Sequence, residues 1–131
     1  MRINFVNIIA VSLLLSAAPL AAMDKETYIM LEVKSMELTL EGMIKQKNCL
    51  EGGGCDTSEL IRISEDTQEK IHSLYLEAGT TPSEAALFYT RHSKEIDPLY
   101  REGETARKLE SIKRRLSQED EEIKTLLESE R

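Results

Sequence analysis

The stretch Cys49-Leu50-Glu51-Gly52-Gly53-Gly54-Cys55-Asp56-Thr57-Ser58-Glu59 decides the fold, because it ends one helix and begins the next within a few residues. Three consecutive glycines cannot sustain a helix, so a helix that precedes them must end here. Asp56 and Glu59 have the spacing of a capping box, with an acceptor at the cap and an acid three residues on. The sequence therefore predicts a tight connection between two antiparallel helices.

The chain has two cysteines, Cys49 and Cys55, which flank five residues of this stretch. An even pair of cysteines is expected to be oxidised in an exported protein, and residues 1–22, described below, predict export. The three glycines give the backbone the freedom to bring the sulfurs together. We therefore predict a structural disulfide that joins the two helices and stabilises the fold by about 2 kcal/mol. The spacing is not Cys-x-x-Cys and the loop contains no basic residue that would activate a thiol, so a redox role is not expected.

Apolar residues recur every three or four positions on both sides of this stretch, which is the pattern of one helix face. Asp24 is placed to cap the first helix, and the apolar stripe of that helix consists of Ile29, Val33, Met36, Leu40 and Met43. The second helix is closed by Gly79 and carries Leu60, Ile63, Thr67, Ile71, Leu74 and Ala78. No stretch alternates apolar and polar residues as a strand would.

A third helix is predicted to begin at Thr81-Pro82-Ser83-Glu84, which combines a Thr cap, a Pro at the first helical position and a Glu at the third. Asp97-Pro98 either breaks this helix or kinks a longer one, and we expect a break because proline cannot donate a backbone hydrogen bond. The last helical segment then places on one side Leu99, Ala106, Leu109, Ile112, Leu116, Ile123, Leu126 and Leu127.

These patterns predict an all-α protein, an up-and-down helical bundle of three to four antiparallel helices that includes a hairpin stapled by one disulfide. Antiparallel neighbours follow from the short connections at the glycine stretch and at Gly79-Thr80. The alternative is a long helical hairpin that dimerises, because each helix has one apolar stripe and only 5% of the residues are aromatic.

Residues 1–22 are predicted to form a signal peptide that is cleaved from the folded domain. Arg2 supplies a basic start, an apolar stretch runs from Phe5 to Leu15, and small residues precede the expected cleavage after Ala22. The stretch is short for a membrane span of about 20 residues, so a membrane anchor is the less favoured alternative and no stable insertion is expected. Residues 23–131 then form a single helical domain that is periplasmic or secreted, with a bacterial periplasm as the first choice.

The 131 residues include 17 basic and 24 acidic side chains, which gives a formal net charge of −7. Removal of the leader takes away Arg2 alone, so the mature chain has 16 basic and 24 acidic residues and a net charge of −8. Nucleic acids and anionic lipids are bound through surplus Lys and Arg, so this balance argues against both as partners. We interpret the short basic cluster Lys113-Arg114-Arg115 as part of a mixed, solvated helix face.

Patterns that would indicate catalysis or metal binding are nearly missing from the sequence. The Glu-x-x-His spacing of metal sites in helical bundles occurs once, at Glu69 and His72. The second histidine, His92, falls in another helix and has Tyr89 at that offset. There is no Gly-x-Ser-x-Gly motif, and the glycine stretch lacks the Lys-Ser/Thr of a phosphate-binding loop. We therefore expect no enzyme activity, no cofactor and no metal.

The acidic surface is the remaining indication of function. A negatively charged face steers a protein onto a basic partner and raises selectivity for it. In size, compartment and charge the chain is similar to small exported helical proteins that inhibit another protein, such as immunity proteins against toxins. We therefore predict a protein-binding module that neutralises a basic toxin or cell-wall hydrolase, with partner contacts at Glu51, Glu119, Asp120, Glu121 and Glu122.

An alternative hypothesis is a structural or chaperone-like periplasmic protein that acts through its helices. Apolar side chains around Leu116, Ile123 and Leu127 would then be exposed and would hold another helix or a second copy of the chain. A homodimer is possible under this hypothesis, whereas an inhibitor needs only an exposed acidic face.

Overall fold

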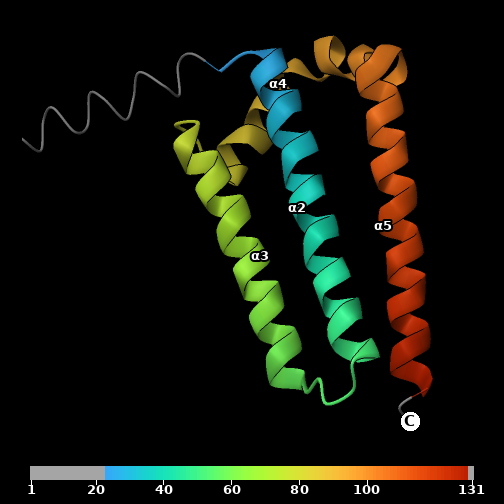
Figure 1. Ribbon diagram of the computed structural model, residues 1–131. Helices are drawn as coiled ribbons and strands as arrows, with labels where there is room; N and C mark the ends of the chain where they lie inside the picture. The colour runs from blue at the N-terminus through green and yellow to red at the C-terminus, as the bar shows by residue number, and fades with distance from the viewer. Residues whose placement is uncertain (1–22, 130–131) are drawn as a thin grey trace, which may run out of the picture.

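The computed structural model describes residues 23–129, and the predicted signal peptide lies outside them. These residues form four helices and no strand: α2 spans Lys25–Glu51, α3 Thr57–Glu77, α4 Pro82–Arg101 and α5 Gly103–Ser129 (Figure 1). The prediction of an all-α helical bundle is confirmed. Within the described part of the chain, no helix combines the length and the apolar character that crossing a membrane requires.

Three of the predicted helix starts, and the predicted end at Gly79, are confirmed by their caps. The side chains of Asp24, Asp56 and Thr81 each accept a hydrogen bond from the backbone N–H three residues on, at 2.8, 2.8 and 3.2 Å. These N–H groups have no partner within the helix, so the cap side chain sets the residue at which each helix begins. Gly79 follows the end of α3 with φ +78°, the left-handed conformation that closes a helix.

The central helix is α2, which has α3 packed along one side and α5 along the other (Figure 1). α3 runs antiparallel to α2, as the short glycine connection predicts. α5 runs parallel to α2, because residue numbers rise together along the two helices. Lys108 pairs with Glu37 at 3.3 Å, and Glu119 pairs with Lys47 at 2.7 Å further down. The antiparallel order therefore holds for the α2–α3 hairpin. It extends neither to α4, which packs on α2 and α5 rather than along α3, nor to α5.

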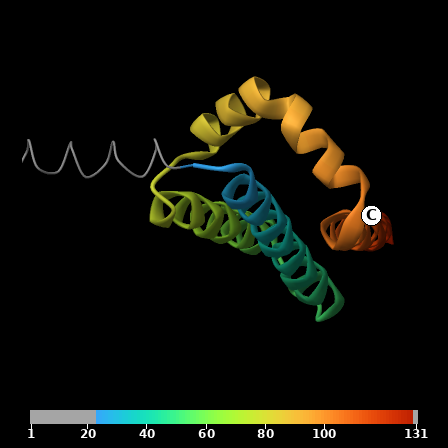
Figure 2. The same cartoon turned by 90° about the horizontal axis from the view of Figure 1, so that it is seen from above.

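α4 makes the parallel arrangement possible because it carries the chain across one end of the molecule. Figure 2 shows it arching from the end of α3 to the beginning of α5. On the way it contacts both α2 and α5. A tight turn after α3 would have reversed the chain, but a 20-residue helix stands in its place. α5 therefore starts at the same end of the molecule as α2.

The predicted helix break at Asp97-Pro98 is wrong, because α4 continues through both residues. Pro98 is exposed, whereas Ile96 is fully buried and anchors this turn of the helix in the core. Burial of Ile96 offsets the hydrogen bond that proline cannot donate. The backbone departs from helical geometry at His92 instead (φ −121°, ψ 18°), and the chain turns into α5 at Gly103, where φ is +85°.

The α2–α3 hairpin is fastened at its lower end by the predicted disulfide. Cys49 and Cys55 are bonded, with their Cα atoms 5.2 Å apart. Further up, Gly42 lets the two helices approach closely, because a Cβ at this position would overlap with the hydroxyl oxygen of Thr67. A disulfide is typical of proteins in oxidising compartments.

The hydrophobic core lies in the upper half of the molecule, where α4 covers α2. The largest fully buried side chains are Leu31 of α2 and Ile96 of α4. The other members of this buried cluster are Tyr28, Ile29, Val33, Tyr75, Ala85, Leu109 and Ile112. All four helices contribute to the cluster, so α4 and α5 share one core with the hairpin.

The four tyrosines of the chain gather in this core near the carboxylate of Glu32. The rings of Tyr28 and Tyr89 stack with centroids 5.7 Å apart. Burial, reinforced by the negative charge of Glu32, raises the pKa of Tyr28 to about 12. The same two causes contribute to the raised pKa values of Tyr75 and Tyr100. The pKa of each of these tyrosine hydroxyls is therefore higher in the fold than that of a free tyrosine.

We expect the free energy of unfolding to fall as the pH rises from about 10 to about 12. Tyr28 ionises near pH 10 in the unfolded chain and at about pH 12 in the fold. Between these pH values the unfolded chain binds fewer protons than the folded one, so a rise in pH stabilises the unfolded state relative to the fold. Urea unfolding at increasing pH, together with tyrosinate absorbance, measures the effect. The loss should be smaller in Tyr28→Phe; an equal loss in that variant would contradict the assignment.

Candidate functional site

The acidic residues predicted to contact a partner come from two helices, Glu51 at the end of α2 and the run Glu119–Glu122 near the end of α5. Successive residues of a helix are rotated by about 100°, so four consecutive acids cannot share one face. The structure accordingly buries Glu119 against α2, leaves Glu122 half-buried beside it and leaves the other two acids exposed.

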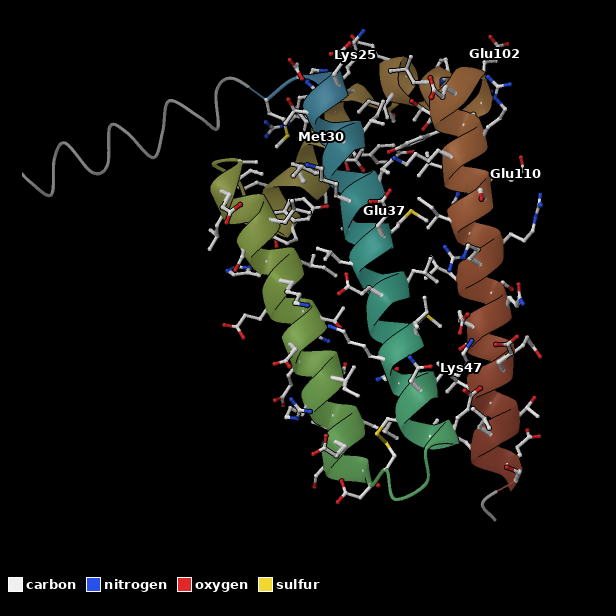
Figure 3. All side chains as sticks on the ribbon, in the orientation of Figure 1. Lys25, Met30, Glu37, Lys47, Glu102 and Glu110 are labelled. Atoms are coloured by element: carbon white, nitrogen blue, oxygen red, sulfur yellow. A yellow bond between two sulfur atoms is a disulfide. The ribbon has the colours of Figure 1, made fainter. Side chains whose placement is uncertain are left out.

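Glu119 faces α2 and is only 8% exposed. The ammonium nitrogen of Lys47 lies 2.9 Å from its Oε1 and 2.7 Å from its Oε2, and Figure 3 shows Lys47 directed toward α5. The hydrogen bond to Glu119, and a second one to Glu122, raise the pKa of Lys47. Glu119 is therefore a structural counter-ion in the α2–α5 contact and offers no accessible carboxylate to a partner.

Glu122 shares the same lysine but reaches the surface. Its Oε2 lies 2.9 Å from the Lys47 ammonium, and 42% of its side chain is exposed. Gln118 donates a hydrogen bond to its Oε1 at 3.2 Å. Lys47 and then Gln118 lower the pKa of Glu122, so this carboxyl group stays ionised at neutral pH while part of it faces solvent.

A hollow of about 310 Å³ opens between the ends of α2 and α5, and we call it the acidic notch. It is lined by Glu51, Glu121, Glu122, Thr125 and Leu126. Glu51 and Glu121 are exposed and form no ion pair with any residue in the range 23–129. Three of the five predicted contacts therefore meet in one place, although they come from the first and the last of the described helices.

The parallel arrangement of α2 and α5 adds to the negative potential of the acidic notch. Both helices end there, and the C-terminal carbonyl groups of a helix carry a partial negative charge. Neither helix has a basic residue in its last turn. α3 begins at the same end, and its positive N-terminus is capped by Asp56. Two helix ends and three carboxylates therefore favour a cation at this position.

Asp120, the remaining predicted contact, does not line the acidic notch. It is exposed and pairs with Lys124 one turn further along α5, at 2.9 Å. Exposed pairs of this kind contribute little, so Asp120 can exchange Lys124 for a cation of a partner at small cost.

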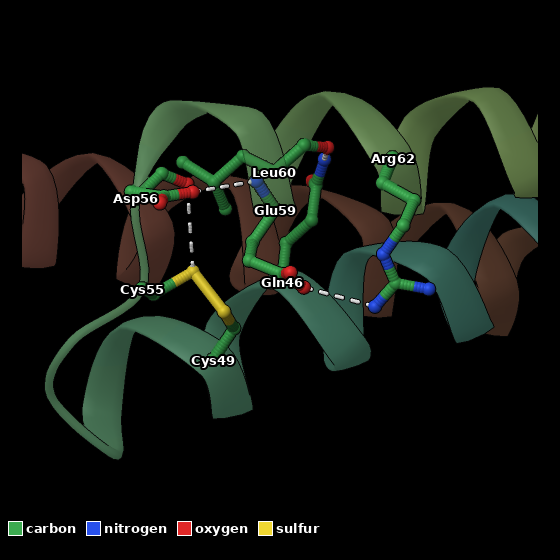
Figure 4. The surroundings of a disulfide bond; sticks show 7 residues. All are labelled: Gln46, Cys49, Cys55, Asp56, Glu59, Leu60 and Arg62. Carbon is green, nitrogen blue, oxygen red and sulfur yellow. Dashed lines mark hydrogen bonds and ion pairs between the residues drawn. A yellow bond between two sulfur atoms is a disulfide. The ribbon is translucent and has the colours of Figure 1, made fainter.

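The position of Glu51 is fixed by the disulfide. Glu51 lies between Cys49 and Cys55, and Figure 4 shows the bond joining the last turn of α2 to the residue before the cap of α3. Gly53 and Gly54 complete the connection with φ values of +73° and +82°, a conformation that other residues rarely adopt. The glycine stretch thus forms a short connection, closed by the disulfide, directly after Glu51.

No known protein family, curated protein or solved structure matches this chain. No related protein therefore indicates what the site binds, and its chemistry follows from its own side chains. Within residues 23–129, no three His, Cys, Asp or Glu side chains are arranged to hold a metal ion. His72 is exposed on α3, and the ring of His92 packs against that of Phe88 with centroids 4.4 Å apart. The two histidines are not brought together.

Lys47 is the residue that sequence analysis misses, although the sequence contains a signal for it. Lys47 follows Met43 by four positions and so continues the apolar stripe of α2. Glu119 follows Leu116 by three positions and continues the stripe of α5 in the same way. A charge within an apolar stripe needs a partner of opposite charge when it is buried. The pattern therefore predicts an ion pair between Lys47 and Glu119.

The apolar side chains expected to be exposed under the chaperone-like hypothesis are mostly covered. Leu116 packs against the core cluster, and Ile123 is half-buried. Leu127 is 42% exposed. This face of α5 therefore presents one accessible large apolar side chain, whereas the acidic notch presents three carboxylates.

Proposed function

We propose that the protein is an exported binding module of the inhibitor or immunity type, which neutralises a basic partner such as a toxin or a cell-wall hydrolase. The observation that carries the proposal is the convergence of Glu51, Glu121 and Glu122 at two helix C-termini. The predicted signal peptide and the disulfide support a periplasmic or secreted location.

The acidic notch suits the binding of a protruding Lys or Arg side chain. Its carboxylates lie on helices, and Glu51 lies within the disulfide-closed segment, so little backbone conformational entropy is lost when a partner binds. Asp120 and the surrounding acidic surface extend the negative potential, which raises the association rate with a basic protein. An inhibitor that covers a cleft needs this combination of fast association and a rigid contact.

The proposal is tested with residues 23–131 and a panel of basic peptidoglycan hydrolases, in which binding and inhibition are measured at low and moderate salt. We expect the double variant Glu51→Lys, Glu121→Lys to weaken binding by about tenfold or more and to flatten its salt dependence, since it reverses the charge of the acidic notch.

A matched control reverses two exposed acids elsewhere. Glu65→Lys, Glu69→Lys on α3 changes the net charge by the same amount and leaves the acidic notch intact. It should weaken binding by about twofold or less, through long-range steering alone. Equal weakening by both double variants would show that only total charge matters, and failure to bind any hydrolase in the panel would count against the proposed function.

A further inference from the structure

A second hollow, with an apolar floor, is a groove at the opposite end from the acidic notch. It has a volume of about 560 Å³ and lies between α2 and the corner where α4 meets α5, so we call it the corner groove. Its floor is apolar and is made of Ile29, Met30, Val33 and Leu99. This size is that of a site for one or two large side chains.

Two of the floor residues are exposed to an extent that folding does not explain. Met30 is 44% exposed and Leu99 is 37% exposed, and both are large apolar side chains. They come from different helices and meet in the same groove. Apolar side chains that gather in a concave, accessible place indicate a binding surface, whereas scattered ones do not.

The rim of the corner groove is acidic. Four glutamates and two lysines line it: Glu26, Glu37, Glu102, Glu104, Lys34 and Lys108. Lys108 pairs with Glu37 at 3.3 Å, and the formal charge of the rim is −2. Figure 3 shows Met30 and Glu37 on α2 and Glu102 at the corner with α5. An apolar floor is thus surrounded by a surplus of carboxylates.

The corner that forms one wall is short and fixed. Glu102 is the single residue between α4 and α5, and Gly103 begins α5 with φ +85°. The buried Ile96 holds the preceding turn of α4 in the core. The wall therefore has little freedom to collapse into the groove, and the space remains open to an incoming side chain.

The charge of the rim decides among possible occupants. An acyl chain with a carboxylate or phosphate head would bring a negative charge to a negative rim. A second copy of this chain has a net charge of −8 after removal of the leader and would be repelled as well. A protein segment that carries Lys or Arg on both sides of a large apolar side chain satisfies both the floor and the rim.

We infer that the corner groove binds a basic-apolar-basic segment of a protein partner, with the apolar side chain on Met30 and Leu99 and the flanking cations at Glu26, Glu102 and Glu104. The inference rests on the proposed function, because the segment bound in the corner groove would belong to the same basic partner. The corner groove and the acidic notch then form two separate contacts at the two ends of α2.

The test uses the chain 23–131 and a fluorescent peptide, Arg-Lys-Leu-Phe-Lys-Arg, flanked by Gly-Ser. Two matched peptides replace Leu-Phe by Ser-Ser or the four basic residues by Glu. Fluorescence anisotropy gives the affinity, and amide chemical shifts locate the bound peptide. We expect the first peptide to bind at least about tenfold more tightly than either control, with shifts at residues of the corner groove.

Protein variants separate the groove from the rest of the surface. Met30→Ser and Leu99→Ser should each weaken binding by about fivefold to tenfold. Leu87→Ser is the control, because Leu87 is 56% exposed on α4 and does not line the groove. The variants change exposed residues, so circular dichroism should confirm an unchanged fold.

Three results would overturn the inference. If the Ser-Ser peptide bound as tightly as the Leu-Phe peptide, the charged rim would bind the peptide without a contribution from the apolar floor. Equal affinity of Leu99→Ser and the unchanged protein would place the peptide elsewhere. Self-association in sedimentation that Leu99→Ser abolishes would make a second copy the occupant. If hydrolase binding still depends on Glu51 and Glu121 in any of these cases, the proposed function stands and only the inference about the corner groove fails.

Discussion

Replacing Leu31 by alanine is expected to lower the free energy of unfolding by about 3–4 kcal/mol. Leu31 is fully buried on the central helix α2, in the core cluster that all four helices share. The substitution removes three carbon atoms and leaves a cavity that α4 cannot fill, because its own anchor Ile96 is already fully buried. Since small domains have a total stability of about 5–15 kcal/mol, this single change should be measurable in any denaturant titration.

Two further variants make the prediction about Leu31 specific. Leu87→Ala is the matched control, because Leu87 is 56% exposed and should cost about 0.5 kcal/mol or less. Ile96→Ala should cost about as much as Leu31→Ala, since Ile96 belongs to the same cluster. A small effect of Ile96→Ala beside a large effect of Leu31→Ala would mean that α4 does not close the core and that the α2–α3 hairpin is stable on its own.

The local features of the fold could be predicted from the sequence because they depend on residues close to one another. Asp24, Asp56 and Thr81 cap their helices through a bond to the N–H three positions on, so a window of four residues contains the whole interaction. The error at Pro98 has the opposite cause. Proline disfavours a helix locally, whereas α4 continues through it because Ile96 is buried against other helices and Tyr89 donates a hydrogen bond to Asp97.

The sequence predicts which acidic residues belong to the candidate site, but it does not predict how they are arranged in space. The sequence shows that Glu51 and the run Glu119–Glu122 are acidic, but their convergence depends on the direction of α5. That direction is set by α4, whose path across the molecule is decided by packing rather than by any motif. The acids of this run also differ in exposure, because rotation along the helix turns Glu119 inward while Glu121 stays exposed.

Replacing Lys47 by methionine is expected to lower the melting temperature by roughly 10 °C, because it leaves a buried carboxylate without its cation. Both oxygens of Glu119 lie within 3 Å of the Lys47 ammonium, and the residue is only 8% exposed. Methionine keeps most of the volume of the lysine stem, so the loss comes from the charge and not from a cavity. Thermal unfolding followed by circular dichroism at neutral pH measures the change.

The double variant Lys47→Met, Glu119→Met should recover most of this loss, since it removes both charges and leaves two apolar side chains of similar length in the α2–α5 contact. Glu122→Gln is the matched control. It removes the other partner of the same lysine, but Glu122 is 42% exposed at its side chain and water can replace the ion pair, so the melting temperature should shift by about 2 °C or less. If the double variant melts as low as Lys47→Met alone, the uncompensated charge of Glu119 is not the source of the loss. Glu119 would then be solvated in solution and available to a partner after all.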